Sequence, residues 1–240
     1  MVRDELVKRS PLRILERSTH GGLGKGNIGV IAAPKGVGKT ACLVHIATDQ
    51  LLEGRHVIHV SFSAQTGHII SWYEDIFEEI AKRYSLDSAM EVHDDIIKNR
   101  VIMNFRQNGV TVQQVRRSLH SMIRDGQFHA DVVVIDGYDF MKATGDDVVH
   151  FKEFAQEASL EIWFSATMRD NAAKRAIDAI PEELYAFMRF FSVFIELEPC
   201  GKYIQLKLVK DHDNTCVADP HLKLDPQILL IAEGLGTSAG

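Results

Sequence analysis

Cysteine is scarce in this sequence and is not arranged for cross-linking. The 240 residues include three cysteines, Cys42, Cys200 and Cys216, and no CxxC pair. An odd and scattered set is typical of reduced thiols. It argues against a disulfide framework and against a cysteine-based zinc site.

Long apolar runs are lacking as well. No stretch approaches the roughly 20 apolar residues that span a bilayer. Residues 1–5, Met-Val-Arg-Asp-Glu, are too charged for a secretory signal peptide. We therefore expect a cytoplasmic protein with no membrane segment.

Basic charge is in deficit. The chain has 27 lysines and arginines against 33 aspartates and glutamates, which gives a net charge of −6. A protein that coats nucleic acid generally needs a broadly basic surface. Nucleic acid is therefore a partner that the charge does not support, although a local basic path, or one formed in an oligomer, stays open.

What the sequence does contain is a regular alternation of apolar runs and amphipathic segments. We expect strands at residues 28–32, 57–62, 101–104, 132–135, 160–165, 191–197, 203–209 and 228–231. We expect helices at residues 3–9, 41–52, 68–98 with a break near 86, from 111 onward, 147–158 and 181–188. This alternation predicts a three-layer α/β/α fold with a mostly parallel central sheet.

Three details refine this prediction. The run 132–135 has no polar alternation, which is typical of a parallel strand covered on both faces. Thr111 with Gln114 matches a helix capping box, and 191–197 with 203–209 could form a hairpin. We divide the chain into an N-terminal segment (1–20), one α/β domain (21–233) and a flexible tail (234–240).

A phosphate-binding loop is the most specific motif. Residues 33–40, Ala-Pro-Lys-Gly-Val-Gly-Lys-Thr, match the pattern G-x-x-x-x-G-K-[ST] except for Ala33 at the first glycine. Glycines let backbone N–H groups surround a phosphate, and the N-terminus of the following helix favours negative charge. The residues expected to bind the nucleotide are Pro34, Lys35, Gly36, Val37, Gly38, Lys39, Thr40 and Ala41.

Within this loop Lys39 is expected to reach the β- and γ-phosphates, and the Thr40 hydroxyl is expected to bind Mg²⁺. Asp136 ends the apolar strand at the sheet edge where α/β proteins bind ligands, so it is the second expected metal residue. The alternatives are a glycine-rich turn for the loop and a helix cap for Asp136. The first alternative leaves the Lys39-Thr40 pair unexplained.

The chain resembles the RecA-like P-loop ATPases, especially the KaiC-like and DnaB-helicase-like branch. The residues that carry the resemblance are Gly24, Gly26 and Asn27, the segments 34–40, 57–62, 132–136 and 162–165, and Lys210. The resemblance covers about residues 20–210, and it implies that the domain 21–233 has a RecA-like fold. It also implies ATP and Mg²⁺ as cofactors, and ATP hydrolysis in rings or filaments of identical subunits that share a site.

Two departures from the family pattern bear on catalysis. Relatives carry a glutamate after the second strand, whereas residues 61–65 here read Ser-Phe-Ser-Ala-Gln, and Gly137 follows Asp136. Gln65 is the residue expected to orient the attacking water, as glutamine does in some GTPases. Weaker substitutes are Glu74, Asp75 and Asp139.

The second departure concerns the cation that relatives extend into a neighbour's site. Their Lys-x-Arg reads Lys210-Asp211-His212 here, so Lys210 is the expected trans-acting residue, without the arginine fork. An exposed strand-end lysine is the alternative. Two less specific groups are a possible metal cluster of Asp211, His212, Asp213 and His221, and a basic loop with Arg169, Lys174 and Arg175.

These observations predict an ATP-binding protein with Lys39, Gln65 and Lys210 as its catalytic residues. The missing glutamate favours a slow ATPase that serves as a nucleotide-dependent regulator or assembly switch. An ATPase motor or recombination-type enzyme on nucleic acid is the alternative. A relative with a purely structural loop is disfavoured by the intact Lys39-Thr40 pair.

Overall fold

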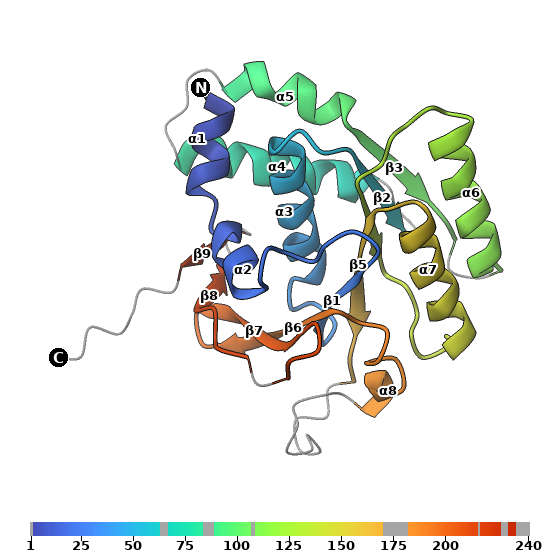
Figure 1. The fold of residues 1–240 in the computed structure, drawn as a ribbon. Coiled ribbons are helices and arrows are strands. Elements are labelled where there is room, and N and C mark those ends of the chain that lie inside the picture. Colours follow the sequence, from blue (N-terminus) through green and yellow to red (C-terminus); the bar gives the residue numbers. More distant parts are fainter. Residues whose placement is uncertain are drawn as a thin grey trace.

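A nine-stranded sheet organises the protein in the computed structural model (Figure 1). The structure describes residues 2–62, 67–83, 89–106, 109–169, 182–215, 217–226 and 230–233. Its helices are α1 Val2–Arg9, α2 Leu12–Ser18, α3 Lys39–Leu52, α4 Gly67–Arg83, α5 Ala89–Lys98, α6 Val112–Arg124, α7 Gly145–Glu157 and α8 Glu182–Tyr185. Its strands are β1 Ile28–Ala33, β2 Val57–Ser61, β3 Arg100–Asn104, β4 Val132–Asp136, β5 Glu161–Thr167, β6 Val193–Cys200, β7 Tyr203–Asp211, β8 Leu222–Leu224 and β9 Ile231–Glu233.

The strand order is β3-β2-β4-β5-β1-β6-β7-β8-β9. The six strands from β3 to β6 run parallel, and β7, β8 and β9 continue the sheet in antiparallel pairs. The sheet is therefore mixed but mostly parallel, as predicted. The hairpin prediction is also confirmed, since β6 and β7 pair antiparallel.

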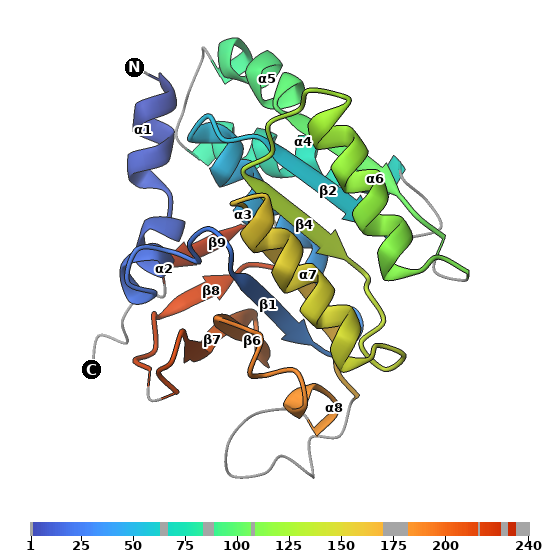
Figure 2. The same cartoon turned by 45° about the vertical axis from the view of Figure 1, so that its right-hand side comes forward.

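Helices cover both faces of the sheet (Figure 2). Helices α1 to α5 pack on one hydrophobic cluster, and α6 and α7 pack on the other. Strand β5 shows how one strand serves both: Trp163 joins the first cluster, and its neighbours Ile162 and Phe164 join the second. Side chains alternate across a strand, so a run without polar residues fills two cores.

Close packing between strands explains Gly29. A Cβ atom at this position would lie 2.5 Å from the Trp163 ring on the neighbouring strand, which is far inside van der Waals contact. Because position 29 is glycine, the indole of Trp163 can pack directly against the backbone of β1, the strand that leads into residues 34–38.

Local signals set the helix starts. Thr111 and Gln114 form the predicted capping box at the start of α6, and Thr144 with Asp147 does the same for α7.

Within the described part of the chain, every helix falls short of the length and apolar character needed to cross a bilayer.

The C-terminal part differs from the prediction. A single strand at 228–231 was expected, whereas the structure has β8 at Leu222–Leu224 and β9 at Ile231–Glu233, and residues 227–229 lie outside the described ranges. Three-residue strands carry too little periodicity to be recognised locally. Strand β8 forms by pairing with β7 and by burial of Leu222 and Leu224, and β9 forms by pairing with β8.

Candidate functional site

The segment 33–40 forms a tight loop between the end of β1 and the start of α3, in the predicted strand–loop–helix context. Gly36 and Gly38 have φ of +84° and +104°. Side chains with a Cβ atom rarely adopt these values, so glycine permits the loop to turn back on itself. Gly38 is also the N-cap residue of α3.

Lys39 points into this loop. Its Nζ donates hydrogen bonds to the carbonyl oxygens of Ala33 at 2.9 Å and Pro34 at 2.8 Å. Burial lowers the pKa of Lys39 to about 8, and the nearby Asp136 carboxylate offsets part of that effect. The ammonium is thus held by neutral carbonyls, which are weaker partners than an ionised phosphate oxygen.

Thr40 and Asp136 meet beside the loop. Thr40 Oγ1 donates a hydrogen bond of 2.9 Å to Asp136 Oδ2, so the two expected metal residues lie in contact. Both are brought there by the carboxyl ends of parallel strands, since β1 leads into α3 and β4 ends at Asp136. Only β5 separates β1 from β4 in the sheet.

Ser165 on β5 is a part of this site that sequence reasoning did not single out. Its hydroxyl donates to Asp136 Oδ1 at 2.6 Å and accepts the backbone N–H of Gly137 at 2.8 Å. It therefore fixes the carboxylate from the side opposite Thr40. A serine within the otherwise apolar run 162–165 was the available signal, because a buried hydroxyl needs partners.

Behind Asp136, His59 on β2 is fully buried and forms a hydrogen bond of 3.0 Å with Tyr73. Burial lowers the pKa of His59 to about 4, although Asp136 acts in the opposite direction. The imidazole is therefore neutral at physiological pH. It adds no positive charge that would compete for the Asp136 carboxylate.

The water-orienting residue expected at Gln65 lies outside the described residues. Of its weaker substitutes, Glu74 pairs with His93 at 2.5 Å and with Arg100 at 3.7 Å. Arg100 pairs with Val57 at the start of β2, four residues before the position opposite Asp136. At about 3.3 Å per residue, the backbone of Arg100 therefore lies about 13 Å along the strands from the level of Asp136.

The other two substitutes have different surroundings. Asp75 is exposed on α4. Asp139 accepts the N–H of Met141 at 3.1 Å and lies 3.2 Å from the Lys142 ammonium. Neither of these two contacts of Asp139 involves a residue of the segment 33–40.

Lys210 lies toward the amino-terminal ends of the parallel strands, whereas the loop of its own chain lies at their carboxyl ends. It pairs with Phe194, which pairs with Val30, three residues before Ala33. Its Nζ donates to the carbonyl oxygens of Met188 at 2.8 Å and Phe191 at 2.7 Å. Contact with a γ-phosphate therefore requires the loop of a second copy.

The unspecific metal cluster considered at Asp211, His212, Asp213 and His221 does not assemble among the described residues. Asp211 contacts His212 and His20, while His221 lies beside Asp219 instead. Among the described residues, one acidic trio, Glu16, Asp49 and Glu53, brings three candidate ligand atoms within 4.8 Å. Arg13 forms ion pairs with all three, so their charge is already partly balanced by an arginine.

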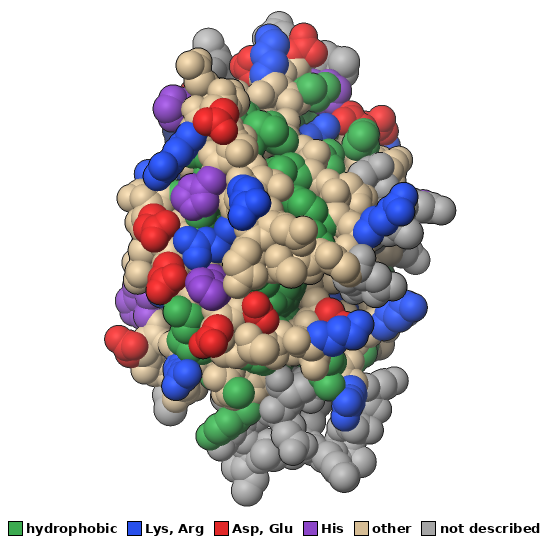
Figure 3. Space-filling view, turned by 90° about the vertical axis from the view of Figure 1, so that its right-hand side faces the viewer, with side chains coloured by type: hydrophobic (Ala, Val, Ile, Leu, Met, Phe, Trp, Pro, Cys, Tyr) green, Lys and Arg blue, Asp and Glu red, His purple; other side chains and the backbone are tan. Residues whose placement is uncertain are grey.

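Basic side chains do not gather on the face formed by α6 and α7. Figure 3 shows basic, acidic and histidine side chains interspersed there, and Arg116 lies 3.8 Å from Glu153 and 3.5 Å from Glu157. In the predicted basic loop, Arg169 is exposed, and Lys174 and Arg175 lie outside the described residues.

A groove of about 470 Å³ lies at the carboxyl edge of the sheet, on the α6 side. Phe62 and Tyr138, which follow β2 and β4, form part of its lining and contact each other with ring centroids 6.0 Å apart. The rest of the lining comes from residues 109–115, which lead into and begin α6, from residues 139–143, and from Asp147 in the first turn of α7.

Comparison of the chain with protein-family models and with curated proteins finds no match. The function is therefore argued from the site itself. That site joins a glycine-supported loop, a desolvated lysine, and a hydroxyl–carboxylate pair at one sheet edge.

Proposed function

We propose that this protein binds ATP with Mg²⁺ at the segment 33–40 and acts as a slow ATPase whose nucleotide state regulates a partner or its own assembly. One observation carries the proposal. Thr40 and Asp136, 96 positions apart in sequence, meet within hydrogen-bonding distance next to the buried Lys39. A glycine-rich turn without a ligand would not require that meeting.

The residues present fit the proposed ligands. A hydroxyl and a carboxylate are hard oxygen donors of the kind that Mg²⁺ prefers. Lys39 supplies a cation inside a loop that opens a helix, where anions are favoured. Bound Mg²⁺ would neutralise charge on the β- and γ-phosphate oxygens. Ser165 holds Asp136 in position, and Thr40 contributes its hydroxyl from the first turn of α3.

A RecA-like fold is the finer structural proposal. Its support is the mostly parallel sheet, the motif-bearing ends of β1 and β4, and the placement of β5 between them. Slow turnover is proposed because Gly137 follows Asp136 and residues 61–65 contain no carboxylate. A residue that only hydrogen-bonds to water is a weaker activator than a general base.

The proposal is tested by nucleotide-dependent thermal stability. ATP with Mg²⁺ at 100 times its dissociation constant is expected to add about 2.7 kcal/mol to the free energy of unfolding. Lys39→Ala should remove this gain, and Lys25→Ala should keep it, because Lys25 is an exposed lysine outside the loop. A wild-type melting temperature unchanged by saturating ATP and Mg²⁺ would refute the proposal.

The alternative, an ATPase that works on nucleic acid, has one observation in its favour. The groove is lined by the partly exposed ring of Tyr138, next to the sheet edge that carries Asp136, and aromatic rings can stack on bases. Fluorescence anisotropy with a labelled single-stranded oligonucleotide, with and without ATP and Mg²⁺, separates the two. Binding that accelerates hydrolysis would favour the alternative.

A further inference from the structure

The loop residue Gly38 is in contact with the C-terminal part of the chain. A Cβ atom at Gly38 would lie 2.7 Å from Cδ2 of Leu224 and 3.7 Å from Cδ1 of Ile204. Apart from the neighbouring residues Val37 and Lys39, no other side chain of the described residues comes within 4 Å of that point. At Gly38 the loop therefore packs against two side chains that lie more than 160 positions later in the sequence.

Leu224 has little freedom to move away. It is fully buried at the end of β8, where it pairs with Ile204 of β7 and Ile231 of β9. The backbone N–H of Asp225 donates to the carbonyl of Leu230 at 2.9 Å and closes the connection between β8 and β9. Leu224 is thus held on both sides by backbone pairing.

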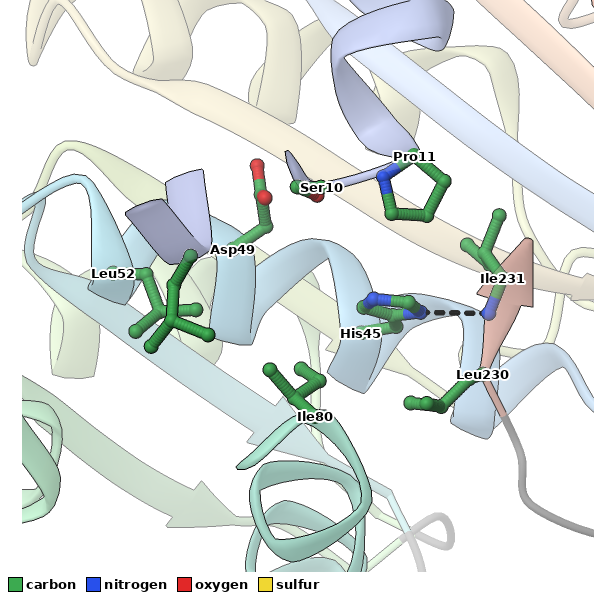
Figure 4. A pocket seen from close by; sticks show the side chains of 9 residues that line it. Ser10, Pro11, His45, Asp49, Leu52, Ile80, Leu230 and Ile231 are labelled. Carbon is green, nitrogen blue, oxygen red and sulfur yellow. Dashed lines mark hydrogen bonds between the residues drawn. The ribbon is translucent and has the colours of Figure 1, made fainter. Parts of the chain in front are cut away.

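The same strand pair also reaches the helix that follows the loop. The N–H of Ile231 donates a hydrogen bond of 2.9 Å to Nδ1 of His45, which is buried on α3 (Figure 4). Because Nδ1 accepts this bond, it carries no proton. The β8–β9 pair therefore contacts the loop at Gly38 and α3 at His45, six residues beyond Lys39.

We propose that Leu224 is a positioning residue for the phosphate loop, and that β8–β9 is the element that holds this loop in its nucleotide-binding conformation. The proposal rests on the nucleotide-binding function proposed above. The argument concerns populations. If the loop is competent to bind for only a fraction of the time, its apparent dissociation constant is the intrinsic constant divided by that fraction. Truncating Leu224 removes the support under Gly38 and lowers the competent fraction.

The coupling must also run in the opposite direction. A ligand that binds the supported loop stabilises the supporting strands by the same free energy. Nucleotide is therefore expected to slow hydrogen exchange at the amides of residues 222–224 and 231–233. A leucine that only fills the core would leave these strands with only the protection that ligand binding gives to all amides through global stability.

Leu222 offers a matched control for the experiment. It is the same residue type on the same strand, is equally buried in the same hydrophobic cluster, and does not approach Gly38. Leu222→Ala and Leu224→Ala should therefore lower the melting temperature by similar amounts. The probe is a fluorescent ATP analogue with Mg²⁺, whose dissociation constant is measured for each variant.

Leu224→Ala is expected to weaken binding of the analogue on the order of tenfold, and Leu222→Ala should leave the constant at the wild-type value. Leu224→Met, which conserves volume, should restore most of the affinity. At equal saturation with nucleotide, protection of 222–224 beyond that of the other core amides should persist in Leu222→Ala and be lost in Leu224→Ala. If either alanine variant fails to fold, the Leu222→Val and Leu224→Val pair replaces it.

Two outcomes overturn the inference and can be told apart. Equal dissociation constants for the two alanine variants, with normal binding by the wild type, remove Leu224 from the site and leave the proposed function intact. Absence of binding by the wild type removes the proposed function, and this inference with it.

Discussion

Thr40 Oγ1 and Asp136 Oδ2 lie 2.9 Å apart, and the hydrogen bond between them joins the first turn of α3 to the end of β4. The same carboxylate is held on its other oxygen by Ser165. Asp136 is therefore fixed between two hydroxyl groups. This arrangement defines the first of four predictions.

Ser165→Ala is expected to weaken the Mg²⁺-dependent part of ATP binding, because Asp136 loses the partner that orients it. It should also lower the free energy of unfolding by about 1–3 kcal/mol, since the buried Asp136 carboxylate loses the hydrogen bond that the Ser165 hydroxyl donates. The measurement is a Mg²⁺ titration at fixed ATP, with urea denaturation alongside. Ser192→Ala is the control, because Ser192 also donates one side-chain hydrogen bond, to Asn27, at the other sheet edge. Equal Mg²⁺ affinity for both variants would contradict this role.

Hydrolysis by the purified chain is expected to be slow, well below the ~1–100 s⁻¹ of typical phosphoryl-transfer kinases. Segment 61–65 and position 137 lack a carboxylate, and Glu74 forms ion pairs with His93 and Arg100. Steady-state phosphate release with saturating ATP and Mg²⁺ measures it. Fast turnover would show that another base acts, and Asp75→Asn and Asp139→Asn would then identify it.

Lys39 should impose a pH dependence on stability in the absence of nucleotide. Its pKa is about 8 in the folded protein and 10.5 ordinarily, so the unfolded state binds more protons between these values. The contribution of Lys39 to the free energy of unfolding therefore rises with pH across that window, and below pH 8 the buried ammonium is a cost.

Lys39→Met should accordingly be more stable than the wild type at pH 7, by about 1–2 kcal/mol after allowance for solvent that reaches the loop. The advantage should shrink as the pH rises from 8 to about 10.5. Urea denaturation at pH 7, 8.5 and 10 measures it, with the exposed Lys25→Met as a control that shows a constant difference. A gap for Lys39→Met that stays constant over this range would show that its pKa is not lowered.

ATP-induced assembly is expected to depend on Lys210, because only the loop of a second copy can meet it. In the single chain its ammonium is bound to the carbonyls of Met188 and Phe191, so entry into an interface must exchange these bonds. Light scattering with ATP and Mg²⁺ should detect an oligomer for the wild type and for Lys202→Ala, an exposed lysine in the β6–β7 turn, but not for Lys210→Ala. Assembly that is indifferent to Lys210→Ala would leave this lysine with a local role in holding residues 188–191.

Sequence patterns were sufficient for most of the elements because those patterns are local. The apolar run at β4, the capping box at Thr111 and the strand–loop–helix around Gly36 and Gly38 each depend on residues a few positions apart. Strand β8 was missed for the complementary reason. Three residues, Leu-Lys-Leu, become a strand only because β7 and β9 lie on either side.

By itself, the sequence determined the α/β alternation and the loop that would hold a phosphate, because period, glycine position and the Lys39-Thr40 pair are properties of contiguous residues. Only the tertiary structure decided which distant groups meet. The order of parallel strands brings Asp136 and Ser165 to Thr40, and the antiparallel β7 carries Lys210 to the opposite edge. The physical reason is that strand order and direction are set by burial of two hydrophobic cores, which no short stretch of sequence encodes.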